Sequence, residues 1–100
     1  GNTFSVRWSG KVLADFSETY TFYTRTDDGV RLYVNNQLII DSWINQSATE
    51  RSGTINLNAG AKYDVRMEYY ENKGKAVAEL RLSAPSVTKQ IIPSSLLFPN

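Results

Sequence analysis

Residues 62–70 read KYDVRMEYY, and an apolar side chain occupies every second position of this stretch. The apolar positions are Tyr63, Val65, Met67 and Tyr69. Lys62, Asp64, Arg66 and Glu68 fall between them and carry charge. A period of two with one apolar and one charged face is typical of a half-buried β-strand. The stretch therefore predicts a strand, and no window of the chain has a comparable helical stripe.

The same alternation recurs along the chain, in runs rich in aromatic and β-branched residues. We expect strands at residues 19–25, 30–34, 37–41, 53–58, 62–70 and 76–83. Residues 4–8 and 11–13 predict an opening strand that is interrupted or bent near Ser9 and Gly10, with Trp8 in the core. After Pro85 the chain is expected to be coil with an apolar ending.

Short polar segments with turn-forming residues separate these runs. Examples are Asp27-Asp28-Gly29 and the two-residue connection Asn35-Asn36, both of which suit hairpins. Short strands joined by turns predict an all-β fold, an antiparallel β-sandwich or barrel. The chain of 100 residues has the length of one domain, so residues 1–100 are expected to form a single unit.

Composition excludes several classes of function. The net charge of +1 provides no basic surface for nucleic acid, and no apolar run has the roughly 20 residues of a membrane span. The chain has no Cys and no His, so by itself it cannot form a zinc finger, a thiol nucleophile or a Ser-His-Asp triad. Any metal must be bound by oxygen, which points to Ca²⁺ or Mg²⁺.

Counting strand directions brings three loops together. If the strands after residue 18 run strictly up and down, the loops 26–29, 42–52 and 71–75 share one end of the domain. Their polar groups are Asp27, Asp28, Asp41, Ser42, Asn45, Gln46, Asn72 and the backbone around Lys73. Carboxylates, amides and free carbonyls are the ligands that Ca²⁺ takes in proteins. Asp-Asp-Gly and Asn-Lys-Gly are also ordinary turn sequences, and both interpretations remain open.

Two long segments carry a resemblance to a known family. Residues 19–43 read TYTFYTRTDDGVRLYVNNQLIIDSW, and residues 50–72 read ERSGTINLNAGAKYDVRMEYYEN. They resemble the PA fourteen (PA14) domain, a β module named after the N-terminal fragment of anthrax protective antigen. The module is shared with yeast flocculins and bacterial glycosidases. The resemblance extends over residues 4–99 and implies carbohydrate binding, in a protein that is secreted or displayed at the cell surface.

The resemblance also implies a ligand set. In sugar-binding members an adjacent Asp pair joined by a cis peptide holds Ca²⁺, and the ion coordinates sugar hydroxyls; here the pair is Asp27 and Asp28. A second loop supplies an Asn and main-chain carbonyls, which correspond to Asn72 and the backbone near Lys73. Trp43, Asn45 and Gln46 are expected to shape selectivity for the glycan. Trp43 has the alternative role of a framework residue that covers the end of the barrel.

One departure from the family affects the predictions. Family members usually have an opening strand segment before the position of Asn2. We therefore expect one sheet edge to be less covered, and to be completed by another chain or by a dimer contact. The other domains of the parent protein are further expected partners. No motif places two carboxyl groups across a scissile bond, so an enzyme is not expected. The sequence predicts a non-catalytic, calcium-dependent glycan-binding module. The alternative is a structural or protein-interaction spacer whose Asp-Asp-Gly is only a turn.

Overall fold

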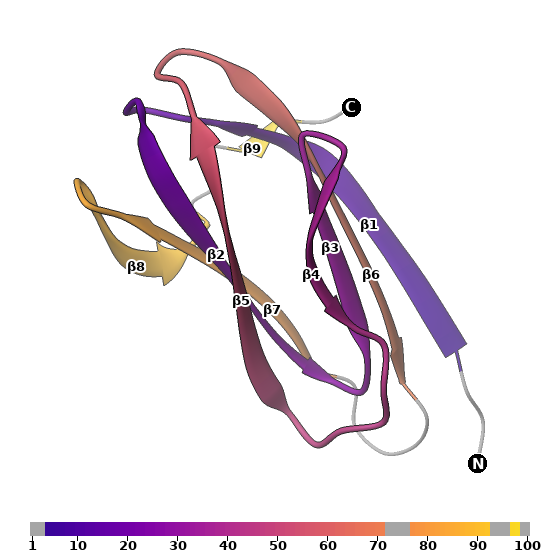
Figure 1. The fold of residues 1–100 in the computed structure, drawn as a ribbon. Helices are drawn as coiled ribbons and strands as arrows, with labels where there is room; N and C mark the ends of the chain where they lie inside the picture. The colour runs from indigo at the N-terminus through magenta and orange to yellow at the C-terminus, as the bar shows by residue number, and fades with distance from the viewer. Residues whose placement is uncertain (1–3, 72–76, 93–96, 99–100) are drawn as a thin grey trace.

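The computed structural model describes residues 4–71, 77–92 and 97–98. Within these residues the chain forms only β-strands, and all pairings are antiparallel. The strands are β1 (Phe4–Leu13), β2 (Glu18–Asp27), β3 (Val30–Val34), β4 (Gln37–Ser42), β5 (Thr49–Leu57), β6 (Lys62–Glu71), β7 (Val77–Ala84), β8 (Val87–Ile91) and β9 (Leu97–Phe98). They build two layers, a sheet in the order β4-β3-β6-β1-β9 and a sheet in the order β5-β2-β7-β8 (Figure 1). The predicted antiparallel β-sandwich is confirmed.

The core lies between the two sheets, on the faces that the alternation predicts. Residues of β2, β3 and β6 point inward at every second position, and these side chains are buried except for Tyr63 and Tyr69 of β6, which are half-buried. The central members of this core are Tyr20, Phe22, Val30, Leu32, Val34, Val65 and Met67. Burial of these side chains from both sheets drives the layers together. Among the described residues there is no helix long and apolar enough to span a membrane.

Some predicted elements are wrong in detail. β1 runs without interruption past Ser9 and Gly10, because buried Gly10 stays in register opposite Val65 of β6. The segment after Pro85 is not all coil, since β8 pairs with β7 and β9 pairs with β1. β5 also begins at Thr49, four residues before the predicted start.

Trp8 is the clearest error in the predicted core. It occupies an inward position of β1 opposite Met67, yet 38% of its surface is exposed. It lines a groove of about 370 Å³ between the sheets, together with Met67, Tyr69, Leu80 and Ile92. Trp8 therefore points towards the interior, but the opposite sheet does not cover its side chain completely.

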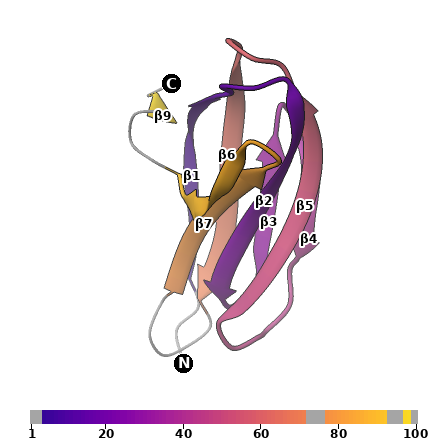
Figure 2. The same cartoon turned by 90° about the vertical axis from the view of Figure 1, so that its left-hand side faces the viewer.

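The two sides of the sandwich differ. In the second view, β1 and β9 lie at one side of the domain, and β4 and β5 lie at the other (Figure 2). The edge strands β4 and β5 approach closely, and Gly53 of β5 lies against the Ile39 backbone of β4. At the opposite side, β9 pairs with β1 only at Lys11 and Val12. No other strand among the described residues lies along this outer edge of β1.

Two buried threonines of β2 allow a stability prediction. The Thr24 hydroxyl is fully buried and has no hydrogen-bond partner among the described residues. Thr24→Val is expected to raise the free energy of unfolding by about 1 kcal/mol, because it removes an unsatisfied buried polar group. Chemical denaturation measures the change. Thr26 is the matched control, since its buried hydroxyl donates to the Asp28 carbonyl at 3.0 Å and Thr26→Val should lower stability. Equal changes in the two variants would contradict the prediction.

Candidate functional site

The β2–β3 turn and the β4–β5 loop lie at the same end of the sandwich, the lower end in Figure 1. The pairings account for this arrangement, because Thr26 of β2 pairs with Thr49 of β5, and Val30 of β3 pairs with both Ser42 and Tyr69. The prediction from strand directions is confirmed for these two segments. Asn72 and Lys73, the candidate ligands from the third loop, lie outside the described residues.

The turn at Asp27-Asp28-Gly29 carries the chain from one sheet to the other. Its Asp27–Asp28 peptide bond is cis, the geometry that the resemblance implies for this pair. The Asp28 N–H donates to the Tyr70 carbonyl at 2.9 Å, and the Tyr70 N–H donates to the Gly29 carbonyl at 3.1 Å. These two backbone bonds tie the turn to the end of β6. Asp28 is buried, with 7% of its surface exposed, whereas Asp27 is half-buried.

Gln46 connects the β4–β5 loop to this turn. Its backbone N–H donates to the Asp28 carboxylate oxygen Oδ1 at 3.0 Å. Its side-chain Nε2 donates to the Asp28 carbonyl at 2.7 Å and also lies 3.4 Å from the Thr26 hydroxyl. One residue therefore fixes both the backbone and the carboxylate of Asp28, and a carboxylate held in this way is oriented in advance for a ligand.

The other end of the Gln46 amide is also occupied. Its Oε1 accepts hydrogen bonds from the Ser42 hydroxyl and from the Arg51 guanidinium, each at 3.2 Å. Both polar atoms of this amide thus have partners within the domain. The contacts give Gln46 a positioning role towards Asp28, which the sequence did not suggest for it.

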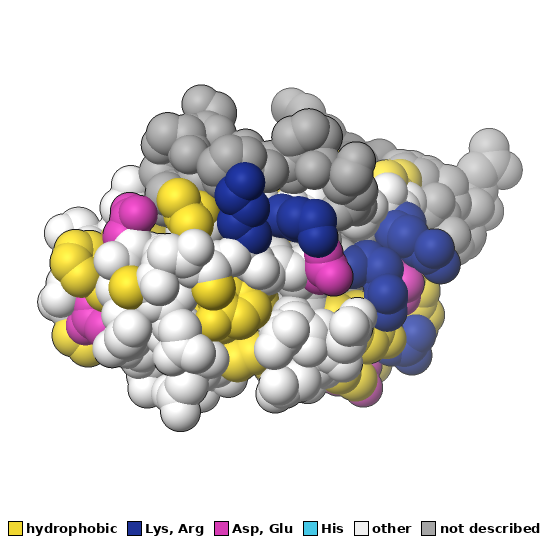
Figure 3. Space-filling view, turned by 90° about the horizontal axis from the view of Figure 1, so that it is seen from above, with side chains coloured by type: hydrophobic (Ala, Val, Ile, Leu, Met, Phe, Trp, Pro, Cys, Tyr) yellow, Lys and Arg dark blue, Asp and Glu magenta, His cyan; other side chains and the backbone are white. Residues whose placement is uncertain are grey.

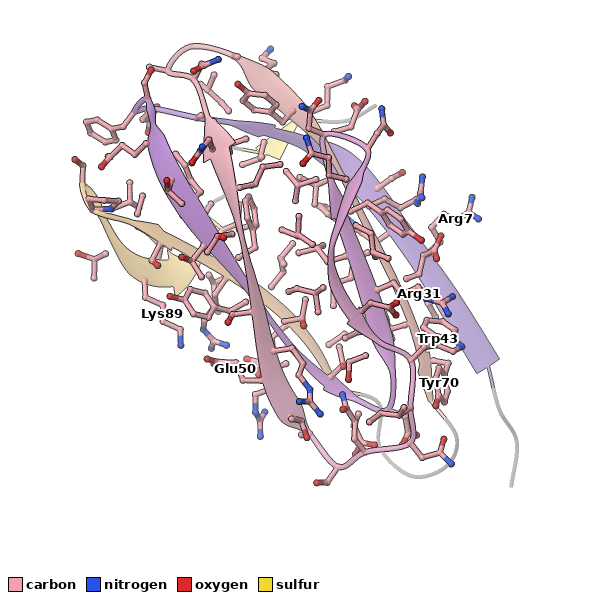
Figure 4. The ribbon with its side chains drawn as sticks, in the orientation of Figure 1. Arg7, Arg31, Trp43, Glu50, Tyr70 and Lys89 are labelled. Atoms are coloured by element: carbon pink, nitrogen blue, oxygen red, sulfur yellow. The ribbon has the colours of Figure 1, made fainter. Side chains whose placement is uncertain are left out.

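An aromatic cluster lies beside the turn. Trp43 and Tyr70 pack with ring centroids 4.8 Å apart, and the Arg31 guanidinium lies 4.6 Å from the Trp43 ring centre. The Tyr70 hydroxyl donates to Asn45 Oδ1 at 2.9 Å. Figure 4 shows Arg31, Trp43 and Tyr70 on the outer side of the same sheet. Trp43 is half-buried, so it supports the loop and still presents part of its ring.

Gly29 permits this close packing. A Cβ atom at this position would overlap the Tyr70 ring and would lie 2.9 Å from the Ile44 backbone nitrogen. The absence of a side chain thus lets the turn, the end of β6 and the β4–β5 loop meet. Four predicted site residues, Asp28, Trp43, Asn45 and Gln46, are joined by this packing and its hydrogen bonds.

Comparison with known proteins assigns the family. The family model of the PA14 domain matches residues 1–96. The chain belongs to this family. The predicted resemblance is therefore confirmed, and the two-layer architecture described above is that of a PA14 domain.

Three relatives of this PA14 domain are informative. The anti-sigma-I factor RsgI3 of Acetivibrio thermocellus is 59% identical over 99 residues, which cover 99% of this chain and 15% of RsgI3. A solved anti-sigma factor domain-containing protein from Clostridium clariflavum is 45% identical, with a TM-score of 0.91 over 96% of this chain and 32% of that chain. The PA14 sugar-binding domain from an RTX adhesin is 27% identical, with a TM-score of 0.81 over 96% of this chain and 54% of that chain.

The chain spans less than two thirds of each of these relatives, and only about a third or less of the two anti-sigma proteins. The three relatives are named for sigma-factor control or sugar binding and not for a reaction. These names agree with the prediction of a binding module rather than an enzyme.

The donor chemistry of the turn suits a hard cation. Asp27 and Asp28 provide two adjacent carboxylates, and an all-oxygen set is what Ca²⁺ prefers. No cluster of three or more Asp, Glu, His or Cys side chains suited to a metal occurs in the part of the chain that the structure describes. A cation held here would therefore complete its six to eight oxygen ligands with amides, backbone carbonyls, water or ligand hydroxyls.

Sequence reasoning missed three contributions to this region. The main chain of Tyr70 holds the turn, Arg51 and Ser42 hold Gln46, and Arg31 covers Trp43. Tyr70 left a signal, because it is a polar-face aromatic at the end of a strand that alternates regularly, and Ser42 is one of the polar residues already expected at this end of the domain. The other contacts join the β4–β5 loop to the strands β3, β4 and β5, and they depend on the path of the loop, which no local pattern marks.

Proposed function

We propose that this PA14 domain is a calcium-dependent glycan-binding module in the extracellular part of a larger protein. The observation that carries the proposal is the Asp27–Asp28 turn, in which Gln46 and Tyr70 fix Asp28 from two sides. The sugar-binding PA14 domain of the RTX adhesin, which matches over 96% of this chain, supports glycans as the ligand class.

Different residues of the end loops bind the metal, orient its ligands and contact the glycan in this proposal. Asp27, Asp28 and the Asn72–Lys73 loop would hold Ca²⁺, which supplies positive charge for two neighbouring sugar hydroxyls. Gln46 orients the Asp28 carboxylate, and Asn45, whose Oδ1 is held by the Tyr70 hydroxyl, directs its amide N–H groups at the ligand. Trp43 provides apolar surface at the edge of the site.

The anti-sigma relatives support a role for the module in its parent protein. RsgI3 and the Clostridium clariflavum protein are named for control of sigma factors. This chain matches 15% of RsgI3 and 32% of the solved Clostridium clariflavum chain, so both are several times longer. A glycan-binding domain attached to such a protein would act as its sensor for extracellular polysaccharide. This role fits the predicted partners, a glycan and the other domains of the parent protein.

Removal of calcium tests the proposal. A glycan array probed with the purified domain is expected to give signals in 1 mM Ca²⁺ (about the concentration that extracellular modules need), and EDTA is expected to abolish those that depend on the Asp27–Asp28 turn. Calorimetric titration with Ca²⁺ alone checks that the metal binds before any sugar. A spacer domain would give neither heat of Ca²⁺ binding nor any EDTA-sensitive signal, and this outcome would refute the proposal.

A further inference from the structure

Two adjoining grooves cross the outer face of the β4-β3-β6-β1 sheet. The first has a volume of about 470 Å³ and is lined by Val6, Arg7, Arg31, Trp43 and Glu68. The second has a volume of about 340 Å³, and its lining includes Arg7, Tyr33, Asn36 and Arg66. Because Arg7 lines both grooves, they adjoin and follow the strands from the loop end towards the β3–β4 hairpin.

Each groove combines an aromatic ring with a guanidinium group. Arg31 lies 4.6 Å from the Trp43 ring centre, and Arg66 lies 4.1 Å from the Tyr33 ring centre. Stacking on a ring holds a guanidinium flat and leaves its edge N–H groups free to donate. Such pairs suit pyranose rings, which have apolar C–H faces and hydroxyl groups around their edge.

The charges on this face are paired. Glu68 lies 3.5 Å from Arg7 and 3.2 Å from Arg66, and Arg31 pairs with Asp41 at 3.2 Å. In Figure 3, seen from above, Lys and Arg side chains extend from the middle of the view to its right-hand side, with Asp and Glu beside several of them. Since Arg7 and Arg66 share Glu68 and Arg31 pairs with Asp41, the three guanidinium groups exceed these two carboxylates by only one charge, and the excess positive potential is small. Its donors and acceptors fit an uncharged ligand rich in hydroxyls.

The face is long enough for a chain of sugars. Asp64 and Tyr70 both occupy outward positions of β6, and the strand rises about 20 Å between them. Arg7, Arg31, Trp43 and Tyr70 lie together on this outer side, away from the core (Figure 4). We propose that this face is a second carbohydrate-binding surface, which takes several residues of a neutral linear polysaccharide along the strands.

This surface is distinct from the loop site. It shares a ligand class with the proposed function and adjoins it at Trp43, but its other residues project from the strands β1, β3 and β6 and not from the turn, and they need no metal. Binding through the strands should therefore persist in EDTA, whereas binding through the turn should not. A polysaccharide chain could contact both regions, because Trp43 borders each of them.

Affinity electrophoresis in EDTA tests the proposal. The gels contain mixed-linkage β-glucan, arabinoxylan or galactomannan as neutral probes, and polygalacturonate as a polyanion. At least one neutral polysaccharide is expected to retard the domain, and Tyr33→Ala and Arg7→Ala should each raise its Kd about tenfold, as loss of a central aromatic or Arg contact does. Tyr33→Phe keeps the ring and should bind like the parent. Thermal denaturation checks that every variant is folded.

Tyr23 provides a matched control on the outer face of the other sheet. Its ring also lies 4.1 Å from a cation, the Lys89 ammonium, so Tyr23→Ala removes a similar pair from the opposite side of the domain. Equal weakening by Tyr23→Ala and Tyr33→Ala would overturn the proposal. Retardation by no neutral polysaccharide in EDTA, or by polygalacturonate alone, would also overturn it. Asp28→Asn is expected to lose only the calcium-dependent binding, which belongs to the loop site. Binding that this variant retains in EDTA would support the strand surface.

Discussion

Gly53→Ala is expected to destabilise the domain by about 3 kcal/mol, the upper end of the usual cost of overpacking a core. A Cβ at this position would overlap the Ile39 carbonyl oxygen and lie 2.8 Å from the carbonyl carbon. The obstacle is backbone, so no side-chain rotation relieves it. Gly53 pairs with Phe22 of the same sheet, while Ile39 belongs to the opposite sheet. The added methyl group must therefore push the two layers apart.

Urea denaturation and thermal melting measure this effect. A loss of about 3 kcal/mol in a domain of this size lowers the Tm by about 12 °C or more. Gly60→Ala is the matched control, because Gly60 has a φ of 83° and a Cβ added there would meet no atom within 4 Å. Its cost comes from the left-handed backbone alone and should be about 1 kcal/mol. If Gly53→Ala were no more destabilising than Gly60→Ala, close contact between β4 and β5 would not be important for the fold.

The alternation of apolar residues was sufficient to predict the faces of most strands. In β3, Val30, Leu32 and Val34 are all buried, as the period of two requires. The pattern succeeds because a strand with one face in the core must alternate. The strand limits that it gave, combined with the assumption that the strands run up and down, predicted that the Asp27–Asp28 turn meets the β4–β5 loop.

The same pattern does not tell how well an inward residue is covered. Trp8 has the predicted orientation, but it lies at the side of the sandwich where the facing layer ends in the five-residue strand β8. Strand β8 itself gave no signal, since four of its five residues are exposed and it has no alternation to detect. Sequence periodicity reports the face of a residue, whereas burial also depends on the extent of the opposite sheet.

The candidate site was predicted in part for a similar reason. Turn sequences and donor chemistry identified Asp27 and Asp28, because both properties are local. The role of Gln46 was not apparent, since its partners Thr26, Asp28 and Arg51 belong to three different segments. Hydrogen bonds between segments depend on register and loop path, and neither is specified by residue type.

Asp28→Asn is expected to weaken Ca²⁺ binding at least about 100-fold, because the affinity of an oxygen site depends on the number of its charged ligands. Calcium-dependent glycan binding should be lost with it. The substitution preserves the shape of the side chain, and an amide oxygen can still accept the hydrogen bond from the Gln46 N–H. Calorimetric titration with Ca²⁺, followed by titration with a glycan identified on the array, measures both effects.

Asp15→Asn is the matched control for the loss of one carboxylate. Asp15 is exposed and lies between β1 and β2, at the end of the domain opposite the candidate site. This variant should bind Ca²⁺ and glycan as the parent does. Unchanged Ca²⁺ affinity in Asp28→Asn would contradict the assignment of Asp28 as a ligand, and equal losses in both variants would indicate a general effect of net charge.

Thermal stability separates a lost ligand from a damaged fold. A metal that binds only the folded state stabilises it by about 2.7 kcal/mol when its concentration is about 100 times the Kd. The parent should therefore melt at a higher temperature in Ca²⁺ than in EDTA, and Asp28→Asn should melt at the same temperature in both. If Asp28 served only the turn, its substitution would shift the Tm equally with and without Ca²⁺. A Tm difference between parent and variant that appears only in Ca²⁺ is the result that requires a metal at Asp28.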